Sequence, residues 1–370
     1  MKEIRKIIQT YDQIDWSNTQ VALATVVNVE ESAYRRIGAR MLVQSSGIWT
    51  GGISGGCLEA DALKRAKVAI LKAEPSIVVY DTLEEDAHQI GVGLGCNGRI
   101  EVLFTPINPE DKNNPIEQLR SIQEKRTPTI FYQVVGANTD NFQCLGHFGI
   151  ENKQTDFCEE VEILNDRLIE NTTIVCAKKR SQLFRFKTRK GIILQILIEF
   201  IRPELKLILV GDNYDVNAFA GIADEMGWEV NVVGLQRKLS KSIFKIAKEI
   251  VHYDDAATLE VDEYTAVVLM SHDFKWDKMV LPIFLKKSLL YIGMLGPKKR
   301  MFKMQNELQT EHPDLDLTVL NNFFSPVGLD IGAETPEEIA LSIAAEIIAN
   351  FRNRQGGFLK NRQGTIYERE

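Results

Sequence analysis

Apolar and polar positions follow one pattern in the first half of the chain and a different pattern in the second. In the first half, short apolar runs bounded by turn signals predict β-strands over residues 21–29, 40–44, 78–80 and 100–104. Residues 129–199 continue as short apolar runs and predict an antiparallel meander. Residues 1–16 are expected to form a helix, and the polar stretch 107–127 is expected to form a loop with one short helix.

The pattern changes at Pro203, where longer apolar runs begin to alternate with helical periodicity. This order of strand, helix and strand is typical of a doubly wound parallel sheet. The apolar pattern after Pro203 predicts a strand over 205–211, a helix over 216–226 ended by Gly227, and a strand over 228–233. It predicts further strands over 266–270 and 289–292. A last helix is expected to begin at Thr335, with Pro at its first position and Glu338 completing a capping box.

Together these elements predict an α/β protein with two domains and a tail. Residues 1–203 form an N-terminal mixed α+β domain with an antiparallel β-rich part, and residues 204–351 a C-terminal Rossmann-like domain with a doubly wound parallel sheet. Residues 352–370 are a polar tail.

Composition narrows the class of protein. The chain has 370 residues, 44% of them hydrophobic and 26% charged, as in ordinary globular proteins. Its net charge of −7 and the lack of a long basic run argue against nucleic-acid binding. No apolar stretch predicts a membrane span or a signal peptide, so a cytoplasmic protein is expected. Five cysteines without a C-x-x-C motif suggest neither a disulfide framework nor structural zinc.

A glycine-dense segment, G-G-I-S-G-G-C-L-E at residues 51–59, predicts a binding site. Such a segment lets backbone N–H groups approach a ligand, and the helical pattern that follows predicts that Cys57 lies near a positive helix end, which lowers a thiol pKa. Cys57 is therefore a candidate nucleophile or soft metal ligand, with a buried cysteine in a tight turn as an equally weighted alternative. The candidate binding residues here are Gly51, Gly52, Ser54, Gly55, Gly56, Cys57 and Glu59.

A second cluster, G-V-G-L-G-C-N-G at residues 91–98, adds Gly95 and Cys96 as candidates. A pair of tight turns explains this cluster equally well, because the residues after it alternate as a strand.

The first strand of the C-terminal domain leads into Gly211-Asp212-Asn213-Tyr214-Asp215-Val216. A dinucleotide fingerprint needs G-x-G-x-x-G and an acidic residue after the second strand, where this chain has Gly234. Only the first glycine is present, so NAD or NADP binding is not expected.

Ligands bind at the carboxyl ends of such strands, where His272 and Asp273 follow the strand at 266–270. We include this pair as candidate ligand-binding residues, although a turn with a helix cap is the more common meaning of such a pair. Arg35, Arg36 and Arg40 precede the first glycine segment and are candidates for phosphate contacts, with exposed surface arginines as the alternative. No constellation of base, nucleophile and orienting residue is visible, so no catalytic residue is predicted.

These motifs together resemble the XdhC/CoxI family. The resemblance covers nearly the whole chain, least clearly at residues 105–200, and rests on the motifs at 24–29, 32–43, 51–59, 93–98, 271–273, 291–300 and 328–340. It implies an accessory protein that binds molybdenum cofactor and protects it while a partner sulfurtransferase, of the cysteine desulfurase type, replaces an oxo ligand by sulfur. The protein then hands the cofactor to an apo-enzyme, a molybdenum hydroxylase such as xanthine dehydrogenase.

The sequence departs from the family pattern at three places. Relatives usually have G-A-G-H-V-G where this chain has G-D-N-Y-D-V, an Asp at the position of Gly234, and a glycine at the position of Asn97. The alternative function is an NAD(P)-dependent oxidoreductase built on the Rossmann-like domain. A homodimer, and a shared cleft that brings Cys57 to the same side as His272, are further expectations.

Overall fold

The computed structural model describes residues 1–31, 34–81, 98–139, 143–151, 165–311, 313 and 315–363. The chain divides into two compact units, Met1–Pro203 and Glu204–Glu370.

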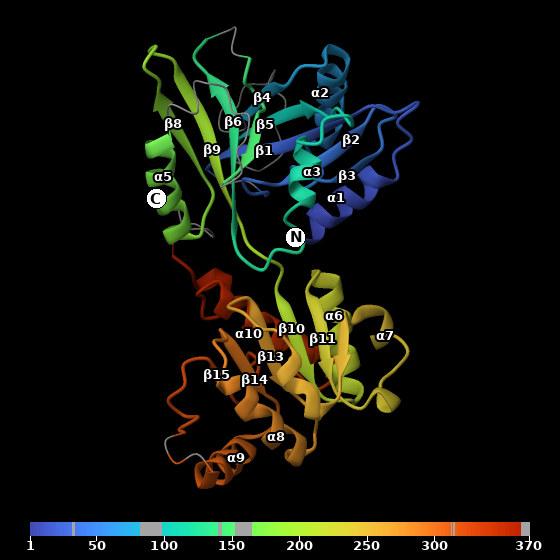
Figure 1. Cartoon of the computed structure of the whole chain (residues 1–370), viewed down its shortest axis with the longest axis vertical. Helices are drawn as coiled ribbons and strands as arrows, with labels where there is room; N and C mark the ends of the chain where they lie inside the picture. Colours follow the sequence, from blue (N-terminus) through green and yellow to red (C-terminus); the bar gives the residue numbers. More distant parts are fainter. Residues whose placement is uncertain are drawn as a thin grey trace. The chain divides into compact units, whose positions relative to one another are not determined.

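The N-terminal unit is built on two antiparallel sheets (Figure 1). The first has the order β3-β2-β1-β5-β4 and consists of β1 (Val21–Glu31), β2 (Arg40–Gln44), β3 (Trp49–Gly51), β4 (Ser76–Asp81) and β5 (Gly98–Pro106). The second has the order β7-β6-β9-β8 and consists of β6 (Thr129–Ala137), β7 (Phe148–Ile150), β8 (Gln182–Lys187) and β9 (Ile193–Ile201).

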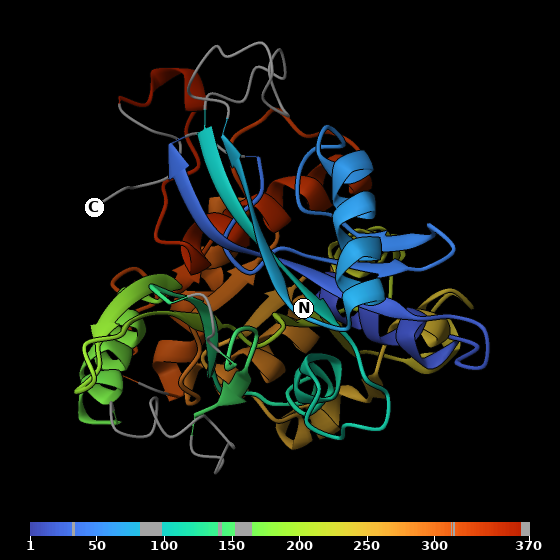
Figure 2. The same cartoon turned by 90° about the horizontal axis from the view of Figure 1, so that it is seen from above.

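Alternating side chains of β1 contribute to several apolar clusters. Ala22 and Ala24 pack against α2 (Glu59–Lys72), which runs beside β1 and β5 (Figure 2). Leu23 belongs to a cluster with residues of α1 (Lys2–Asp12) and α3 (Pro115–Arg120). Val27 packs with residues of β5, β6 and β9, so the two sheets share a small core. The predicted strand at 40–44 and the short helix within 107–127 are both confirmed.

One helix lies inside the region that we expected to be a meander of strands. It is α5 (Asn165–Lys178), and its residues Leu168, Thr172 and Val175 are buried at helical spacing against β6 and β9. The run Thr172-Thr173-Ile174-Val175 consists of β-branched residues, which favour strands by propensity. Packing of the apolar stripe outweighs that propensity, and the expectation of a pure meander was wrong here.

The C-terminal unit contains a six-stranded parallel sheet with the order β12-β11-β10-β13-β14-β15 (Figure 1). Its strands are β10 (Lys206–Val210), β11 (Glu229–Val233), β12 (Glu249–Val251), β13 (Thr265–Leu269), β14 (Tyr291–Met294) and β15 (Phe323–Phe324). Numbered along the chain, this is the order 3-2-1-4-5-6 of the Rossmann fold. The predicted fold class is confirmed in both units.

Helices cover both faces of this sheet, which explains why its strands are continuous apolar runs. On one face, α6 (Tyr214–Met226) and α10 (Pro336–Phe351) pack on the sheet, and on the other α8 (Phe274–Leu285) and α9 (Lys298–Glu311) do. Gly227 ends α6 in the left-handed conformation with φ 75°, and the capping box at Thr335 is formed as predicted. The short helix α7 (Ile243–Ile246) and the 3-10 turns η1 (Gln236–Lys238), η2 (Tyr253–Thr258) and η3 (Leu359–Asn361) complete the unit.

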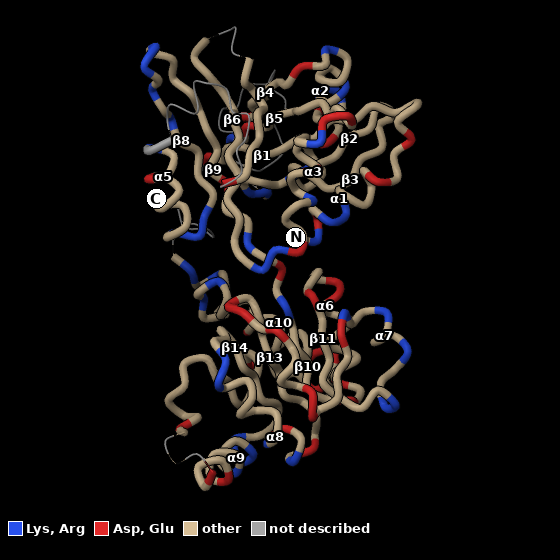
Figure 3. Tube along the Cα trace, in the orientation of Figure 1, with Lys and Arg blue, Asp and Glu red and all other residues tan. Residues whose placement is uncertain are grey.

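Three expectations drawn from composition can be compared with the structure. No helix within the described residues is long and apolar enough to cross a membrane. Acidic and basic residues are interspersed over both units in the view of Figure 3. Cys144 is disulfide-bonded, a bond that the number and spacing of the cysteines did not suggest, whereas Cys57 and Cys176 are free thiols.

Candidate functional site

The first glycine segment connects the end of β3 to the start of α2 and is held tightly at its first residue. Gly51 has φ +85°, and a Cβ at this position would lie 2.3 Å from the carbonyl oxygen of Arg40. The same carbonyl accepts the N–H of Gly52 at 2.9 Å. A side chain is therefore excluded at residue 51 by backbone conformation and by space.

Ser54 and Glu59 close the segment on itself. The Glu59 carboxylate accepts the backbone N–H of Ser54 at 2.9 Å and also the Ser54 hydroxyl. Burial raises the pKa of Glu59, but the hydrogen bonds from Ser54 and from the backbone outweigh it and hold the pKa below the ordinary glutamate value. Ser54 Oγ in turn accepts the N–H groups of Gly56 at 3.2 Å and Leu58 at 3.1 Å. The start of α2 is thereby fixed.

A hollow of about 640 Å³ opens beside this loop. Its wall includes Gly51, Gly52, Ser54, Gly56 and Glu59, and it also includes residues of α1 and the exposed Trp49 of β3. The charged residues of the wall are three cations and two carboxylates: Lys2, Lys6, Arg35, Glu3 and Glu59. We call this hollow the glycine-loop pocket.

Lys6 is the cation most available to a ligand. Arg35 is ion-paired with Glu3, and Glu59 is held by Ser54. No hydrogen bond or ion pair of Lys6 is found in the part of the chain that the structure describes, and its side chain is exposed. With both carboxylates engaged, the pocket favours an anionic ligand group.

The tip of the loop presents backbone donors. Gly56 has φ +111° and open space within 4 Å of the position that a Cβ would take. Among the described residues, the backbone N–H groups of Gly55 and Cys57, on either side of it, have no hydrogen-bond partner. The exposed ring of Tyr34 lies against Gly55, 3.3 Å from the position of a Cβ. Unpaired N–H groups just before a helix are suited to bind a phosphate.

Cys57 is exposed, so the alternative of a buried cysteine in a tight turn was wrong. Its Sγ lies 3.5 Å from Ser54 Oγ, and the residue is absent from the wall of the glycine-loop pocket. No group of three or more His, Cys, Asp or Glu side chains suited to a metal occurs among the described residues. Molybdenum ligation by Cys57 therefore stays a prediction.

The three arginines before the loop have different environments. Arg35 lines the glycine-loop pocket, while Arg36, also a predicted binding residue, is half-buried outside its wall. Arg40 is neither a phosphate ligand nor an exposed surface arginine: its guanidinium is buried and forms two bonds to Glu199, at 3.0 and 2.5 Å. The second glycine cluster, with Gly95 and Cys96, lies outside the described residues.

The loop after β10 is filled by its own side chains. Asn213 caps α6, accepting the N–H groups of Asp215 at 3.0 Å and Val216 at 3.3 Å, and its amide donates to the Met270 carbonyl at 2.6 Å. These are the N–H groups that would meet a pyrophosphate in a dinucleotide-binding protein. The buried Asp212 accepts the N–H of Leu235 at 3.1 Å.

His272 and Asp273 serve local structure in this unit. Asp273 is the N-cap of α8 and accepts the Lys275 N–H at 2.9 Å. His272 has φ 59°, and its Nε2 lies 2.5 Å from the carboxylate of Asp215, at the N-terminus of α6. The turn with a helix cap, which we considered the more common meaning of this pair, describes the observed geometry. A ligand role for the pair stays a prediction.

The part of the pocket that α1 supplies was not among the predicted site residues. Lys2 and Lys6 are one helical turn apart and so lie on one face, a pattern visible in the sequence. Their position beside the glycine loop follows from packing of Ile7 of α1 next to Gly51, which no local pattern predicts.

The fold and sequence together define the class of protein. The chain matches the XdhC and CoxI family over residues 17–81 and the XdhC Rossmann domain over residues 207–347. The chain belongs to the XdhC and CoxI family.

Three known proteins show how far the similarity extends. The chain is 30% identical to a protein of Bacillus subtilis named as a probable subunit of xanthine dehydrogenase, over 89% of this chain and 92% of that protein. It is 22% identical to the molybdenum cofactor insertion chaperone PaoD of Escherichia coli, over 90% of this chain and 83% of that protein. A crystal structure described as a xanthine dehydrogenase from Bacillus halodurans is 26% identical with a TM-score of 0.72, covering 95% and 97% of the two chains.

Proposed function

We propose that this protein is an accessory protein that binds molybdenum cofactor and assists its insertion into a molybdenum hydroxylase of the xanthine dehydrogenase type. The observation that carries the proposal is the similarity, over nine-tenths of the chain, to a protein named a molybdenum cofactor insertion chaperone. The two other relatives are both named after xanthine dehydrogenase. Their names support a molybdenum hydroxylase of that type as the enzyme that receives the cofactor.

The glycine-loop pocket is the proposed binding site for the phosphate end of the cofactor. Molybdopterin carries a phosphate, and phosphates are bound by helix N-termini, unpaired backbone N–H groups and cations. The pocket wall offers Lys6 of α1. Gly56 of the wall is flanked by Gly55 and Cys57, whose backbone N–H groups have no partner among the described residues. The surroundings of Gly56 leave room for a ligand to approach the backbone.

Cys57 is proposed to act in the sulfuration stage. Its thiol is exposed next to the loop, where a soft ligand or an acceptor of sulfur from a partner sulfurtransferase is useful. Cys57→Ala is expected to keep the melting temperature and to lower delivery of sulfurated cofactor. If alkylation of the folded protein leaves Cys57 unmodified, or the variant melts several degrees lower, Cys57 is a packing residue instead.

Two other functions remain to be compared with this proposal. A stable component of a xanthine dehydrogenase is favoured by the names of two relatives. An NAD(P)-dependent oxidoreductase is favoured by the strand order of the C-terminal unit alone, and the self-capped loop at Asn213 argues against it.

The proposal is tested by expressing the chain in cells that make molybdenum cofactor. The purified protein is expected to carry the cofactor, detected as a pterin fluorophore and as molybdenum, and to activate a cofactor-free hydroxylase when the two are mixed. Lys6→Ala is the test variant, and Lys238→Ala, which removes an exposed lysine beside Asp212 in the other unit, is the matched control.

Each outcome separates the candidates. Cofactor on the wild type and on Lys238→Ala, with a clear loss on Lys6→Ala, supports the proposal. Protein that never carries cofactor, even in the presence of the hydroxylase, contradicts it. Protein that stays bound to the hydroxylase after activation and is required for turnover is a component of the enzyme.

A further inference from the structure

A second hollow in the N-terminal unit is lined by residues that the proposed function does not use. It has a volume of about 720 Å³, within the range of small-molecule sites. One wall is the loop before α3 together with the outer face of α3, and the other is the segment 143–148 before and into β7. We call it the carboxamide groove, because Asn108, Asn113, Asn114, Gln118 and Gln143 all line it.

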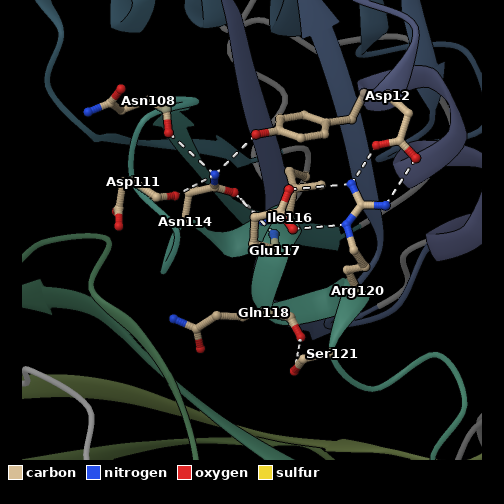
Figure 4. Close-up of polar contacts among 10 residues, drawn as sticks. Asp12, Asn108, Asp111, Asn114, Ile116, Glu117, Gln118, Arg120 and Ser121 are labelled. Carbon is tan, nitrogen blue, oxygen red and sulfur yellow. Dashed lines mark hydrogen bonds and ion pairs between the residues drawn. The ribbon is translucent and has the colours of Figure 1, made fainter.

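The wall formed by the loop before α3 is held in one conformation by Asn114 (Figure 4). The buried Asn114 caps α3 by accepting the N–H of Ile116 at 2.9 Å. Its amide nitrogen donates to the carbonyl of Asp111 at 2.8 Å and approaches the Tyr11 hydroxyl at 3.2 Å. Because one side chain bridges the loop, the helix and α1, the groove is preformed.

The charges along the groove are balanced, unlike those of the glycine-loop pocket. Arg120 is held between Glu117, at 2.9 Å, and Asp12 of α1, at 2.5 Å (Figure 4). The other charged residues of the wall are the exposed pair Asp111 and Lys112. The two cations of the wall are matched by two carboxylates, so the groove carries no net charge and is suited to a neutral ligand.

Two oxygen atoms of the groove residues lack a hydrogen-bond donor. Both N–H groups of the Gln118 amide are used, on the carbonyls of Asn113 and Phe148 at 2.8 Å each, which fixes the amide orientation. Within the described part of the chain, Gln118 Oε1 then has no partner, and neither has Oγ1 of Thr105, a side chain that is only 8% exposed. A buried acceptor without a donor is unfavourable, and a ligand N–H removes that cost.

The groove also has apolar side chains in its wall. Pro75, Pro106 and Phe148 line it, and Phe148 is itself stacked on Phe131 at 4.6 Å between ring centroids. Proline and phenylalanine side chains favour contact with the face of a planar ring. Carboxamides, which carry both donors and an acceptor, pair with the edge of a ring that carries N–H donors and a carbonyl.

We propose that the carboxamide groove binds a neutral planar heterocycle whose edge combines N–H donors with a carbonyl, the chemistry shared by pterin and guanine. Thr105 Oγ1 and Gln118 Oε1 accept the donors, and the prolines and Phe148 cover the ring faces. This inference is independent of the glycine-loop pocket.

The test uses the full chain with free pterin, guanosine and adenosine as probes, followed by pterin fluorescence and calorimetry. Thr105→Val is the test variant: it keeps the shape of the side chain and removes only a hydroxyl that has no partner within the described residues. Its melting temperature is expected to equal or exceed that of the wild type. Thr172→Val is the matched control, since its hydroxyl is also buried but pairs with Tyr132 at 2.9 Å.

The expected result is micromolar binding of pterin and guanosine, at least tenfold weaker binding of adenosine, and at least a tenfold loss of pterin affinity in Thr105→Val alone. Equal pterin affinity of Thr105→Val and the wild type, or no saturable binding, overturns the proposal. Pterin binding lost in Lys6→Ala and kept in Thr105→Val assigns the heterocycle to the glycine-loop pocket. That outcome overturns this inference and leaves the proposed function standing.

Discussion

The two units each have a glycine-containing loop between a strand and a helix, and the two loops are filled differently. Before α2, Gly56 faces open space, and neither Lys6 nor the N–H groups of Gly55 and Cys57 have a partner among the residues that the structure describes. Before α6, the side chain of Asn213 takes the helix N–H groups, as a phosphate would. A helix N-terminus that its own side chain has capped offers little to an anion.

Glycines in the second loop serve chain packing. A Cβ on Gly211 would lie 2.9 Å from the Met270 carbonyl oxygen, and one on Gly234 would lie 2.7 Å from the Gly211 carbonyl oxygen. Gly234, which replaces the usual acidic residue, is therefore needed to let β11 end close to the loop after β10. A glycine in a nucleotide-type loop is thus insufficient evidence for a ligand. The side chains around the glycine determine whether the helix N–H groups are free to bind one.

The largest difference in stability is expected between substitutions of two glycines in the first loop, Gly51 and Gly56. Gly51→Ala places a Cβ against the Arg40 carbonyl in a left-handed backbone and is expected to lower the free energy of unfolding by about 3 kcal/mol or more. Gly56→Ala carries only the conformational strain and is expected to cost about 1–2 kcal/mol. Urea unfolding of both variants measures the difference; equal losses would mean that space at residue 51 is unimportant.

In the second loop, Asp212→Ala tests whether the loop is stabilised by its own side chains. Removing the carboxylate leaves the N–H of Leu235 and the hydroxyl of Tyr253 without their acceptor, at a cost of about 2–3 kcal/mol in unfolding free energy. The exposed Asp224 on α6 provides the matched control, and Asp224→Ala is expected to change stability by less than about 0.5 kcal/mol. Similar effects of the two substitutions would show that Asp212 does not hold the loop.

Asn213→Ala removes the cap of α6 and is expected to cost about 1 kcal/mol. Freeing the helix N–H groups is not expected to create a dinucleotide site, because Asp212 and Asp215 still repel a pyrophosphate. Calorimetry with NAD, NADP and ATP on both proteins checks this. A low-micromolar dissociation constant for a dinucleotide on the wild type would promote the oxidoreductase function.

The smallest effect concerns the pH dependence contributed by Glu59. Because its pKa is lower in the folded state than in the unfolded state, the stabilisation is fully present above the unfolded value of about 4.5 and is lost as pH falls through the folded pKa. Between about pH 5 and pH 3, the wild type is expected to lose more stability than Glu59→Gln. Parallel stability curves for the two proteins would show that the Ser54 contacts do not favour the charged form.

Much of the fold follows from local patterns, whereas most of the candidate site depends on distant contacts. Strand β2 and the capping box of α10 were predicted at their residues because alternation and capping are local signals. Helix α5 was missed because its β-branched residues favour strands, and only packing on β6 and β9 makes the segment helical.

The site depends on residues that are far apart in the chain. Arg40 was misjudged because its partner Glu199 is 159 positions away. Lys6 was missed because contacts between residues far apart in the chain place α1 beside the glycine loop: Ile7 packs near Gly51, and the hydroxyls of Thr10 and Thr50 lie 3.0 Å apart. A sequence pattern identifies the loop, and the fold decides which cations surround it.

The most direct test of the difference between the two loops is the affinity of the full chain for isolated molybdenum cofactor, with one lysine removed beside each loop. Lys6→Ala is expected to raise the dissociation constant about tenfold, the equivalent of one charge-assisted contact of about 1.4 kcal/mol. Lys238→Ala is expected to leave the constant unchanged. An unchanged dissociation constant for Lys6→Ala together with a tenfold increase for Lys238→Ala would assign the cofactor to the loop after β10 and contradict the proposed site.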